Sequence, residues 1–322
     1  MKFLRMFVLI AGAVALALPF AATAQFPSKP VRIMVGYVAG SSTDIVGRII
    51  ADRLGEYWKQ SVIVENRGGA AGNLAADAVA KAPGDGYTLL FAQNGLAISA
   101  AALPNLPYKA ETDLTPLAPV AATAHILVVA PGLPVKNVQE LIALARAEPG
   151  KLTYGSSGIG NSDHLCGELF AMMAGIETVH VPYKGGAPVA TDLIANRLSF
   201  YFAGMPVGLP LAKSGRAPGI AVTGKQRSAS APDIPTVAEQ GLPDYEAKLW
   251  QGFFAPASIA PELGERIARD VQAVLALPAT RAKLAAVGVE LFEDNQANFR
   301  RFFSAEVAKW RAVVSKTNLK LQ

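Results

Sequence analysis

Val31-Arg32-Ile33-Met34-Val35-Gly36-Tyr37-Val38-Ala39-Gly40-Ser41-Ser42-Thr43-Asp44 is the stretch that decides the fold. Its first five residues are mostly β-branched or apolar and predict a buried strand, while Gly36 to Ser42 predict a loop. Ser42 or Thr43 then caps a helix, because apolar residues recur at helical spacing from Ile45 to Leu54. A strand, a loop and a helix in this order form the repeating unit of an α/β protein.

The same unit recurs along the chain. The sequence predicts further strands at 62–64, 87–91, 126–129, 152–154, 179–182, 200–202 and 220–223, with helices near 73–81, near 138–147 and from 163. Near-continuous apolar strands that alternate with helices favour mainly parallel sheets with helices on both faces. We therefore expect an α/β fold.

The last part of the chain is predicted to return to the first domain. A connection rich in Pro, Ser and Gly at 228–244 precedes an extended segment at 248–256 and three helical stretches near 261–277, 280–287 and 295–315. We interpret these helices as part of a discontinuous domain 1, 25–124 and 249–322, with 125–248 as domain 2. A ligand cleft is then expected between two lobes.

The N-terminus predicts export. Lys2 and Arg5 precede an apolar stretch from Met6 to about Leu18, and Ala22-Thr23-Ala24 follows it. A charged start, a short apolar run and a small-x-small triplet are typical of a signal peptide, and the run is shorter than a membrane span. We predict that residues 1–24 are removed after Ala24 and that the mature protein is periplasmic.

The composition narrows the classes of function. The chain has 322 residues, a net charge of +5, and a single cysteine, Cys166. It has neither basic runs nor basic stripes interleaved with aromatic residues, so nucleic acid is not expected as a partner. One cysteine cannot form an internal disulfide. The length is sufficient for two domains with cores of their own.

Catalytic motifs are incomplete. The histidines are His125, His164 and His180, and none has metal-ligand spacing, so we expect no metal site. A secreted hydrolase that uses Ser156 or Ser157 with His164 is the alternative enzyme. No carboxylate is clearly placed in the sequence to orient the imidazole of such a site.

Cofactor motifs are incomplete as well. The segment 219–226 has the spacing of a phosphate-binding loop, but Gln226 stands where the Mg²⁺-binding Ser or Thr belongs. Gly158-Ile159-Gly160 lacks the third glycine of a dinucleotide motif. We therefore expect no cofactor.

Two strand–loop–helix junctions, 36–44 and 156–164, suit an anion. Each combines glycines with Ser, Thr or Asn side chains at the start of a helix. Glycines let a ligand approach the backbone, and a helix N-terminus offers unpaired N–H groups and the positive end of its dipole. Ordinary caps and turns give the same pattern in one loop. A matched pair, one in each lobe, favours a ligand site.

Eight stretches match a known family in order and spacing: YVAGSSTD (37–44), VENRGGAAGN (64–73), DGYTLL (85–90), YGSSG (154–158), HLCGELF (164–170), VPYKG (181–185), DIPTVAE (233–239) and FAPA (254–257). Over nearly its whole length the chain resembles the Bug family, the extracytoplasmic substrate-binding proteins of tripartite tricarboxylate transporters. The resemblance implies a two-lobed periplasmic-binding-protein-like fold of type II. Such a protein closes on a small carboxylate without a cofactor and delivers it to integral membrane transporter subunits. We expect a monomer, and a sensor subunit for a signalling kinase is the alternative role.

The resemblance also implies which residues contact the ligand. By position, they are Tyr37, Val38, Ala39, Gly40, Ser41, Ser42, Gln93, Asn94, Ser156, Gly158, Asn161 and His164, with Ser157 as a further donor and Tyr183 at the mouth of the cleft. Many relatives have Asp where this chain has Ala203, and in amino-acid-binding members that Asp can meet the ligand's ammonium group. With Ala203 we expect a ligand without an amine, such as a dicarboxylate or an aromatic acid.

Overall fold

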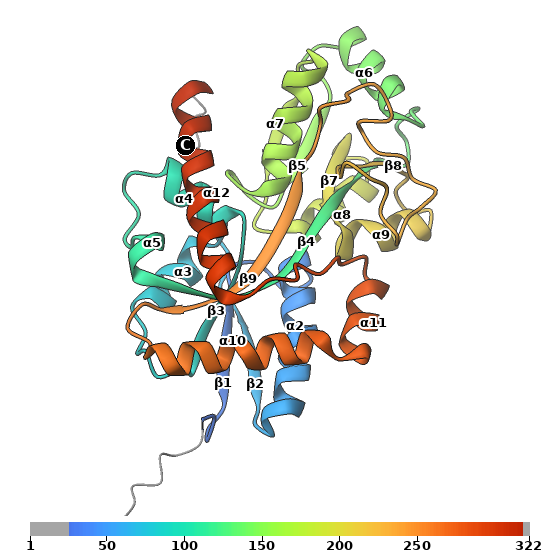
Figure 1. Cartoon of the computed structure of the whole chain (residues 1–322). Coiled ribbons are helices and arrows are strands. Elements are labelled where there is room, and N and C mark those ends of the chain that lie inside the picture. The colour runs from blue at the N-terminus through green and yellow to red at the C-terminus, as the bar shows by residue number, and fades with distance from the viewer. Residues whose placement is uncertain (1–25, 318–322) are drawn as a thin grey trace, which may run out of the picture.

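The computed structural model describes residues 26–317, which form two α/β lobes joined by long crossing strands (Figure 1). The strands are β1 (Val31–Val35), β2 (Val62–Asn66), β3 (Thr88–Gln93), β4 (Leu114–Val129), β5 (Thr153–Ser156), β6 (Val179–Pro182), β7 (Phe200–Gly204), β8 (Gly219–Val222) and β9 (Lys248–Pro256). The helices are α2 (Ser42–Trp58), η1 (Ala70–Gly72), α3 (Asn73–Ala80), α4 (Gly95–Ala102), α5 (Ala110–Asp113), α6 (Val138–Ala147), α7 (Ser162–Ala174), α8 (Gly186–Ile194), α9 (Met205–Lys213), α10 (Pro261–Ala276), α11 (Pro278–Ala286) and α12 (Gln296–Thr317). The predicted signal peptide, 1–24, lies outside the described residues.

The outer strands of each lobe follow the predicted α/β pattern. In the first lobe β1 pairs in parallel with β2 and β3, and in the second lobe β5 pairs in parallel with β6 and β7. The loops after β1 and β5 therefore leave the carboxyl ends of parallel strands, where ligands bind in such sheets. The strand order β2-β1-β3-β9-β4-β7-β5-β6 shows that β9 and β4 connect the lobes.

The crossing strands depart from the prediction of mainly parallel sheets. β4 pairs antiparallel with β7, β8 and β9, and β9 also pairs antiparallel with β3. The sequence predicted only the end of β4, because Pro116 and Pro119 interrupt its first half and proline cannot donate a ladder hydrogen bond. The register with β9 shifts next to both prolines, which lets the strand continue past them. The fold is a mixed, two-lobed α/β architecture.

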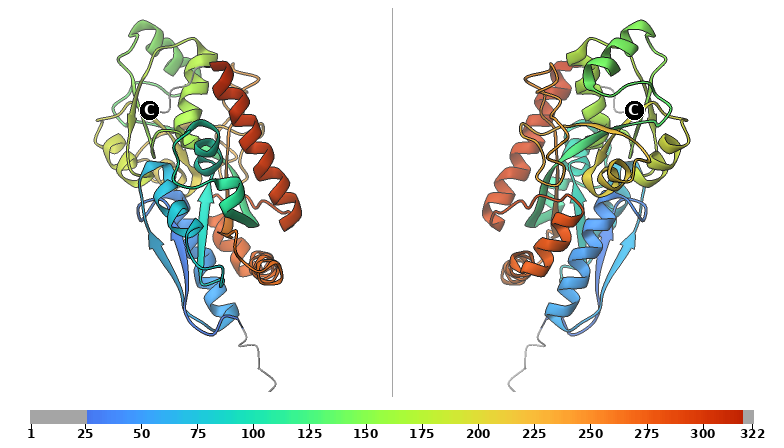
Figure 2. Two further views of the ribbon diagram at one scale, coloured as in Figure 1. Left: turned by 90° about the vertical axis from the view of Figure 1, so that its left-hand side faces the viewer. Right: turned by 90° about the vertical axis from the view of Figure 1, so that its right-hand side faces the viewer.

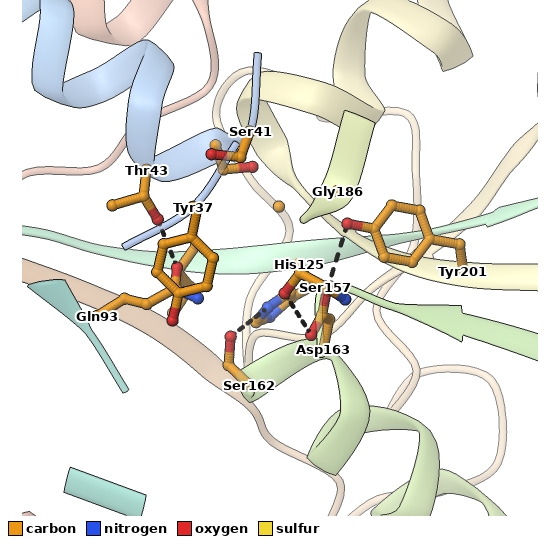
Figure 3. A pocket seen from close by; sticks show the side chains of 13 residues that line it. Tyr37, Ser41, Thr43, Gln93, His125, Ser157, Ser162, Asp163, Gly186 and Tyr201 are labelled. Carbon is orange, nitrogen blue, oxygen red and sulfur yellow. Dashed lines mark hydrogen bonds between the residues drawn. The ribbon is translucent and has the colours of Figure 1, made fainter. Parts of the chain in front are cut away.

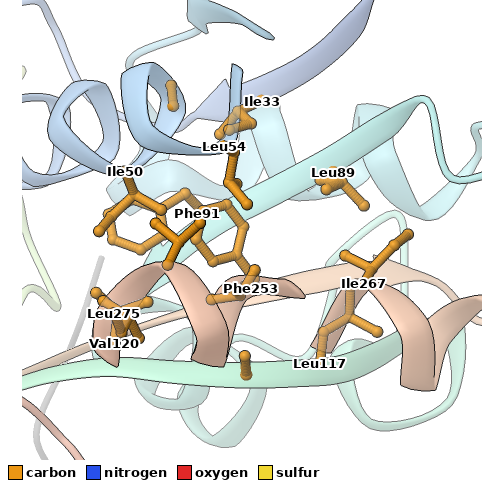
Figure 4. Close-up of a cluster of buried hydrophobic side chains, with 14 of the residues drawn as sticks. Ile33, Ile50, Leu54, Leu89, Phe91, Leu117, Val120, Phe253, Ile267 and Leu275 are labelled. Atoms are coloured by element: carbon orange, nitrogen blue, oxygen red, sulfur yellow. The ribbon is translucent and has the colours of Figure 1, made fainter. Parts of the chain in front are cut away.

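The C-terminal helices pack on the first lobe. Ile267 of α10 lies in the same buried cluster as Ile33, Leu54 and Phe91 (Figure 4). α12 contributes Phe299 to a second cluster of that lobe and runs along the outside of the molecule (Figure 2). Helices on both faces of the first sheet therefore hold the loop after β1 in place.

β4 changes its pairing partner between the lobes. Ala124 pairs with Lys248 of β9, whereas His125 pairs with Gly204 of β7. We keep the division into 25–124 with 249–322, and 125–248, as a proposal, because the change of partner falls at the same place. No described helix is long and apolar enough to cross a membrane.

Candidate functional site

A small polar cavity lies where the two predicted loops face each other between the lobes (Figure 3). Its free volume is about 20 Å³, enough for about one water molecule. It is lined by Tyr37, Ser41, Ser42, Thr43, Gln93, His125, Ser157, Ser162, Asp163, Gly186, Tyr201, Gly204 and Leu249. Both lobes and the crossing strands contribute to this lining, as a site that closes around a ligand requires.

The first loop, residues 36–41, is held from outside the cavity by Asp44. The Asp44 carboxylate accepts hydrogen bonds from the Gly40 amide (2.9 Å), the Arg48 Nε (2.9 Å) and the Asn66 Nδ2 (2.8 Å). Burial alone raises the pKa of Asp44, but these bonds outweigh it and lower the pKa below its ordinary value. Asn66 also donates to the Tyr37 carbonyl at 2.9 Å. The acid at the start of α2 is thus neutralised away from the cavity.

The first lobe presents neutral donors at the N-terminus of α2. Ser41 is the N-cap, and its hydroxyl accepts a hydrogen bond from the Asp44 amide at 3.3 Å. The Thr43 hydroxyl donates to Gln93 Oε1 at 2.7 Å and accepts from Gln251 Nε2 at 3.3 Å. Ser42 completes the group. Hydroxyl and amide donors at the positive end of a 17-residue helix suit a carboxylate.

In the second loop, residues 157–161, the hydrogen-bond donors of Ser157 are bound to the Asp163 carboxylate. The Asp163 carboxylate accepts hydrogen bonds from the Ser157 amide (2.7 Å), the Ser157 hydroxyl (2.9 Å) and the His164 amide (2.9 Å), and Tyr201 donates at 3.4 Å. The side chain is buried, and burial raises its pKa to about 6 although these bonds act in the opposite direction. The Ser157 donors that the sequence assigned to the ligand are therefore occupied.

Tyr37 and Asn161 connect the two loops across the cleft. The Tyr37 hydroxyl donates to Asn161 Oδ1 at 2.8 Å and lies 3.1 Å from the Ala71 carbonyl. Burial raises the pKa of Tyr37 well above its ordinary value, so the hydroxyl keeps its proton. Asn161 is fully buried, and its Nδ2 has no hydrogen-bond partner among the described residues. This hydrogen bond is one of several contacts between the lobes, since Ser228 also donates to Glu290 Oε1 at 3.3 Å and Ser230 to the Ala285 carbonyl at 3.2 Å.

The histidines gather around the N-terminus of α7. His125 lines the cavity, with its Nε2 3.1 Å from the Ser162 hydroxyl and its Nδ1 3.5 Å from Cys166 Sγ. The rings of His164 and His180 lie 4.0 Å apart between centroids. Burial lowers the pKa of each of the three histidines to about 4, so all are neutral at pH 7.

The hydrolase pair predicted from the sequence does not form. Ser156 Oγ lies 2.6 Å from His180 Nε2, and Ser157 bonds to Asp163, so neither serine reaches His164. His164 Nδ1 instead accepts a hydrogen bond from the Gly160 amide at 3.2 Å. Ser156 is fully buried and lines no part of the cavity. A nucleophile needs access to its substrate, and this serine lacks it.

Several other predicted contacts lie outside the cavity lining. Asn94 bonds to the backbone of β9, because its Nδ2 donates to the Lys248 carbonyl (3.2 Å) and its Oδ1 accepts from the Trp250 amide (2.8 Å). Tyr183 donates to Asp192 Oδ2 at 2.6 Å. Ala203 belongs to the hydrophobic cluster of the second lobe. The remaining predicted residues that do not line the cavity are Val38, Ala39, Gly40, Ser156, Gly158, Asn161 and His164.

The structure brings together five of the predicted contact residues and eight others. The predicted contacts that line the cavity are Tyr37, Ser41, Ser42, Gln93 and Ser157, and the others are Thr43, His125, Ser162, Asp163, Gly186, Tyr201, Gly204 and Leu249. Thr43, Ser162 and Asp163 belong to the two predicted junctions, and Ser162 was expected there as a neutral donor. The others lie on β4, β7, β9 and α8, and no local sequence pattern shows that these elements meet at one cavity. Within residues 26–317, no three His, Cys, Asp or Glu side chains are grouped to hold a metal ion.

Comparison with known proteins identifies the family. The model of the tripartite tricarboxylate transporter family receptor, TctC, matches residues 46–319. The chain belongs to the TctC family. It is 32% identical over 299 residues to protein BugT of Bordetella pertussis, covering 92% of each sequence. The predicted resemblance to the Bug proteins is confirmed.

Solved structures confirm the two-lobed fold of this TctC protein. The R. palustris protein Rpa4515, solved with adipate, is 35% identical with a TM-score of 0.87, covering 90% of this chain and 97% of that one. MatC from Rhodopseudomonas palustris, solved with bound malate, is 25% identical with a TM-score of 0.84, covering 90% of this chain and 100% of that one. Proteins of the TctC family are periplasmic solute-binding proteins.

Proposed function

We propose that this protein captures a small dicarboxylate between its lobes and delivers it to the membrane subunits of a tripartite tricarboxylate transporter. The observation that carries the proposal is the cavity, to which the first lobe contributes the hydroxyls of Ser41 and Ser42 at the N-terminus of α2. Preorganised donors of this kind form charge-assisted hydrogen bonds with an anion, which are roughly twice as strong as neutral ones. Such donors can bind a carboxylate without an arginine side chain.

Capture proceeds by closure. The cavity lining is complete only when both lobes meet, so an acid that contacts both halves binds the closed form better and shifts the population toward it. The Tyr37–Asn161 contact favours the same closed form. Open and closed forms then present different surfaces to the transporter subunits. The protein acts as a monomeric carrier and converts no substrate.

The shape and polarity of the cavity support a compact ligand. Leu249 is the aliphatic side chain in its lining, so a large aromatic body finds little apolar wall there. The two relatives solved with adipate and with malate support an aliphatic dicarboxylate. The expectation of a ligand without an amine rested on Ala203. Because its side chain packs in the hydrophobic core, the proposed ligand class is not restricted to acids without an amine.

Binding of defined acids to wild type and two variants tests this proposal. We expect succinate, malate or adipate to raise the thermal unfolding temperature, because a ligand that binds only the native state stabilises it by mass action. Ser41→Ala and Ser42→Ala each remove one hydroxyl donor and are expected to weaken binding by about 1.5–3 kcal/mol, the range for hydrogen bonds to charged groups. Ser214→Ala makes the same change at the end of α9, outside the cavity, and is the control. Absence of a shift with every acid, or unchanged binding by both variants, contradicts the proposal.

The periplasmic location has a separate test. We propose that the precursor is cleaved after Ala24, which leaves Gln25 as the first residue of the mature protein. The intact mass of the protein recovered from the periplasm of an expressing bacterium measures this directly. A mass that includes residues 1–24 contradicts cleavage.

A further inference from the structure

Asp163 is a buried acid that lines the cavity in which we propose that an anion binds. Among the described residues, it is the only Asp or Glu in the lining, and the lining contains no Lys or Arg. Asp163 is 4% exposed and forms no ion pair within residues 26–317. Part of the proposed binding site therefore already carries negative charge when Asp163 is ionised.

No positively charged side chain faces Asp163 within the described residues. The groups that face it are Ser157 and the His164 amide, Tyr201 from β7, Cys166 from α7, Tyr37 from the first loop and His125 from β4, across the cavity. Burial lowers the pKa of His125 to about 4 and raises the pKa values of Cys166, Tyr37 and Tyr201, so each of these side chains is neutral at pH 7. Hydrogen bonds and the partial positive charge at the N-terminus of α7 stabilise the Asp163 carboxylate.

A dicarboxylate in this cavity creates a pair of like charges at close range. The hydroxyl donors of Ser41 and Ser42 suit one ligand carboxylate at the first lobe. The remainder of the ligand then extends toward Ser157, Asp163 and Tyr201. When two carboxylates share a poorly solvated site, the pKa of one rises strongly and the pair holds one proton.

We propose that Asp163 determines the charge state in which the cavity takes its ligand: a dicarboxylate binds with the uptake of one proton, which Asp163 holds. This inference rests on the proposed function. The proton comes from solvent and adds to a carboxylate oxygen, so one O–H bond forms and none breaks. Oδ2 is the favoured oxygen, because its contact with Tyr201 is long, 3.4 Å, and lets the new O–H donate to the ligand or to the phenol oxygen.

The pH dependence of binding follows from the direction of this change. Burial raises the pKa of Asp163 to about 6 in the unliganded protein, so the proton is already bound below that pH and must be taken up above it. The dissociation constant is therefore expected to rise with pH, by up to about tenfold per pH unit between 6 and the pKa of Asp163 in the complex. Below pH 6 this dependence levels off.

Isothermal titration with succinate, malate and adipate at pH 6.5, 7.5 and 8.5 tests the inference. Repeating each titration in two buffers with different heats of ionisation gives the number of protons taken up, which we expect to approach one at pH 7.5. Asp163→Asn keeps the shape and an acceptor for Ser157 but cannot take up the proton. We expect its binding to change less than twofold between pH 6.5 and 8.5, and to be tighter than wild-type binding at pH 8.5. Asp233→Asn, at an exposed position of the same lobe, is the matched control and keeps the wild-type pH dependence.

The outcomes separate this inference from the proposed function. Failure of all three acids to bind at any pH contradicts both. Binding of an acid to wild type without proton uptake contradicts only the role of Asp163, and shows that a group of the ligand satisfies this carboxylate instead. Proton uptake that persists in Asp163→Asn and is lost in His125→Gln assigns the proton to His125 and overturns the inference. If a variant fails to fold, the absence of proton uptake in the wild-type titrations still overturns the inference.

Discussion

Replacing Tyr37 by phenylalanine removes the hydroxyl that donates a hydrogen bond to Asn161 of the other lobe. In the closed form this hydroxyl lies 2.8 Å from Asn161 Oδ1, and its loss leaves both ends of the buried Asn161 amide without a partner. A neutral hydrogen bond contributes about 0.5–1.5 kcal/mol, and an unsatisfied buried polar group costs about 1–3 kcal/mol. The closed form is therefore expected to lose about 1–3 kcal/mol relative to the open form.

The loss appears directly in ligand affinity, because the acid binds the closed form. A change of 1–3 kcal/mol corresponds to a dissociation constant that is roughly 5- to 150-fold higher. Isothermal titration with the acid that binds wild type measures it, and small-angle scattering shows whether the ligand still reduces the radius of gyration. Tyr57→Phe is the control, because Tyr57 is 49% exposed and lies on the surface of α2. A dissociation constant within twofold of wild type refutes the view that this contact stabilises closure.

Two further predictions concern closure and pH. In Gly204→Ala the added Cβ meets Ser42 Oγ of the other lobe at 2.4 Å, so overpacking of about 1–3 kcal/mol is expected to weaken ligand affinity and the ligand-induced compaction. Gly264→Ala in α10 is the control, because its methyl group has room. Equal ligand affinities of the two variants contradict this prediction. Stability is expected to fall as the pH is lowered from about 6.5 to about 4, because His125, His164 and His180 have folded pKa values of about 4 and the unfolded chain binds their protons first. Thermal unfolding across this range measures the trend. Asp163, with its pKa raised to about 6, opposes it, so Asp163→Asn is expected to show a steeper fall, and a flat profile in both proteins contradicts the prediction.

The sequence predicted the parts of the fold that depend on local patterns. β1, the first loop and α2 follow one another within a few residues, and the strand, the glycines and the capping serine each have their own signal. The first half of β4 was missed because its prolines resemble a loop, and its pairing depends on β9, more than a hundred residues away. α9 was missed for a similar reason, since Pro206, Gly208 and Pro210 weaken the helical pattern in its sequence.

The sequence predicted the donors of the candidate site better on the side of the first loop than on the side of the second. Ser41 and Ser42 face the cavity as expected, because a helix N-terminus that follows a parallel strand points its donors at the ligand region. The second junction has the same pattern, yet Asp163 occupies its donors, and the sequence does not show which side chain a loop amide will choose. Asn94 follows β3 as predicted but binds the backbone of β9, a contact that only the fold creates. Residues contributed by the crossing strands have no local signal.

A crystal structure of the mature protein with a bound dicarboxylate tests the central claim most directly. We predict that one carboxylate lies within about 3 Å of the Ser41 or Ser42 hydroxyl, a normal hydrogen-bond distance, while the rest of the acid contacts Ser157, Asp163 or Tyr201 of the other lobe. An acid that contacts only one lobe contradicts the claim. So does an acid bound in the hollow of about 320 Å³ beside α10 and α11 with the cavity between the lobes unoccupied.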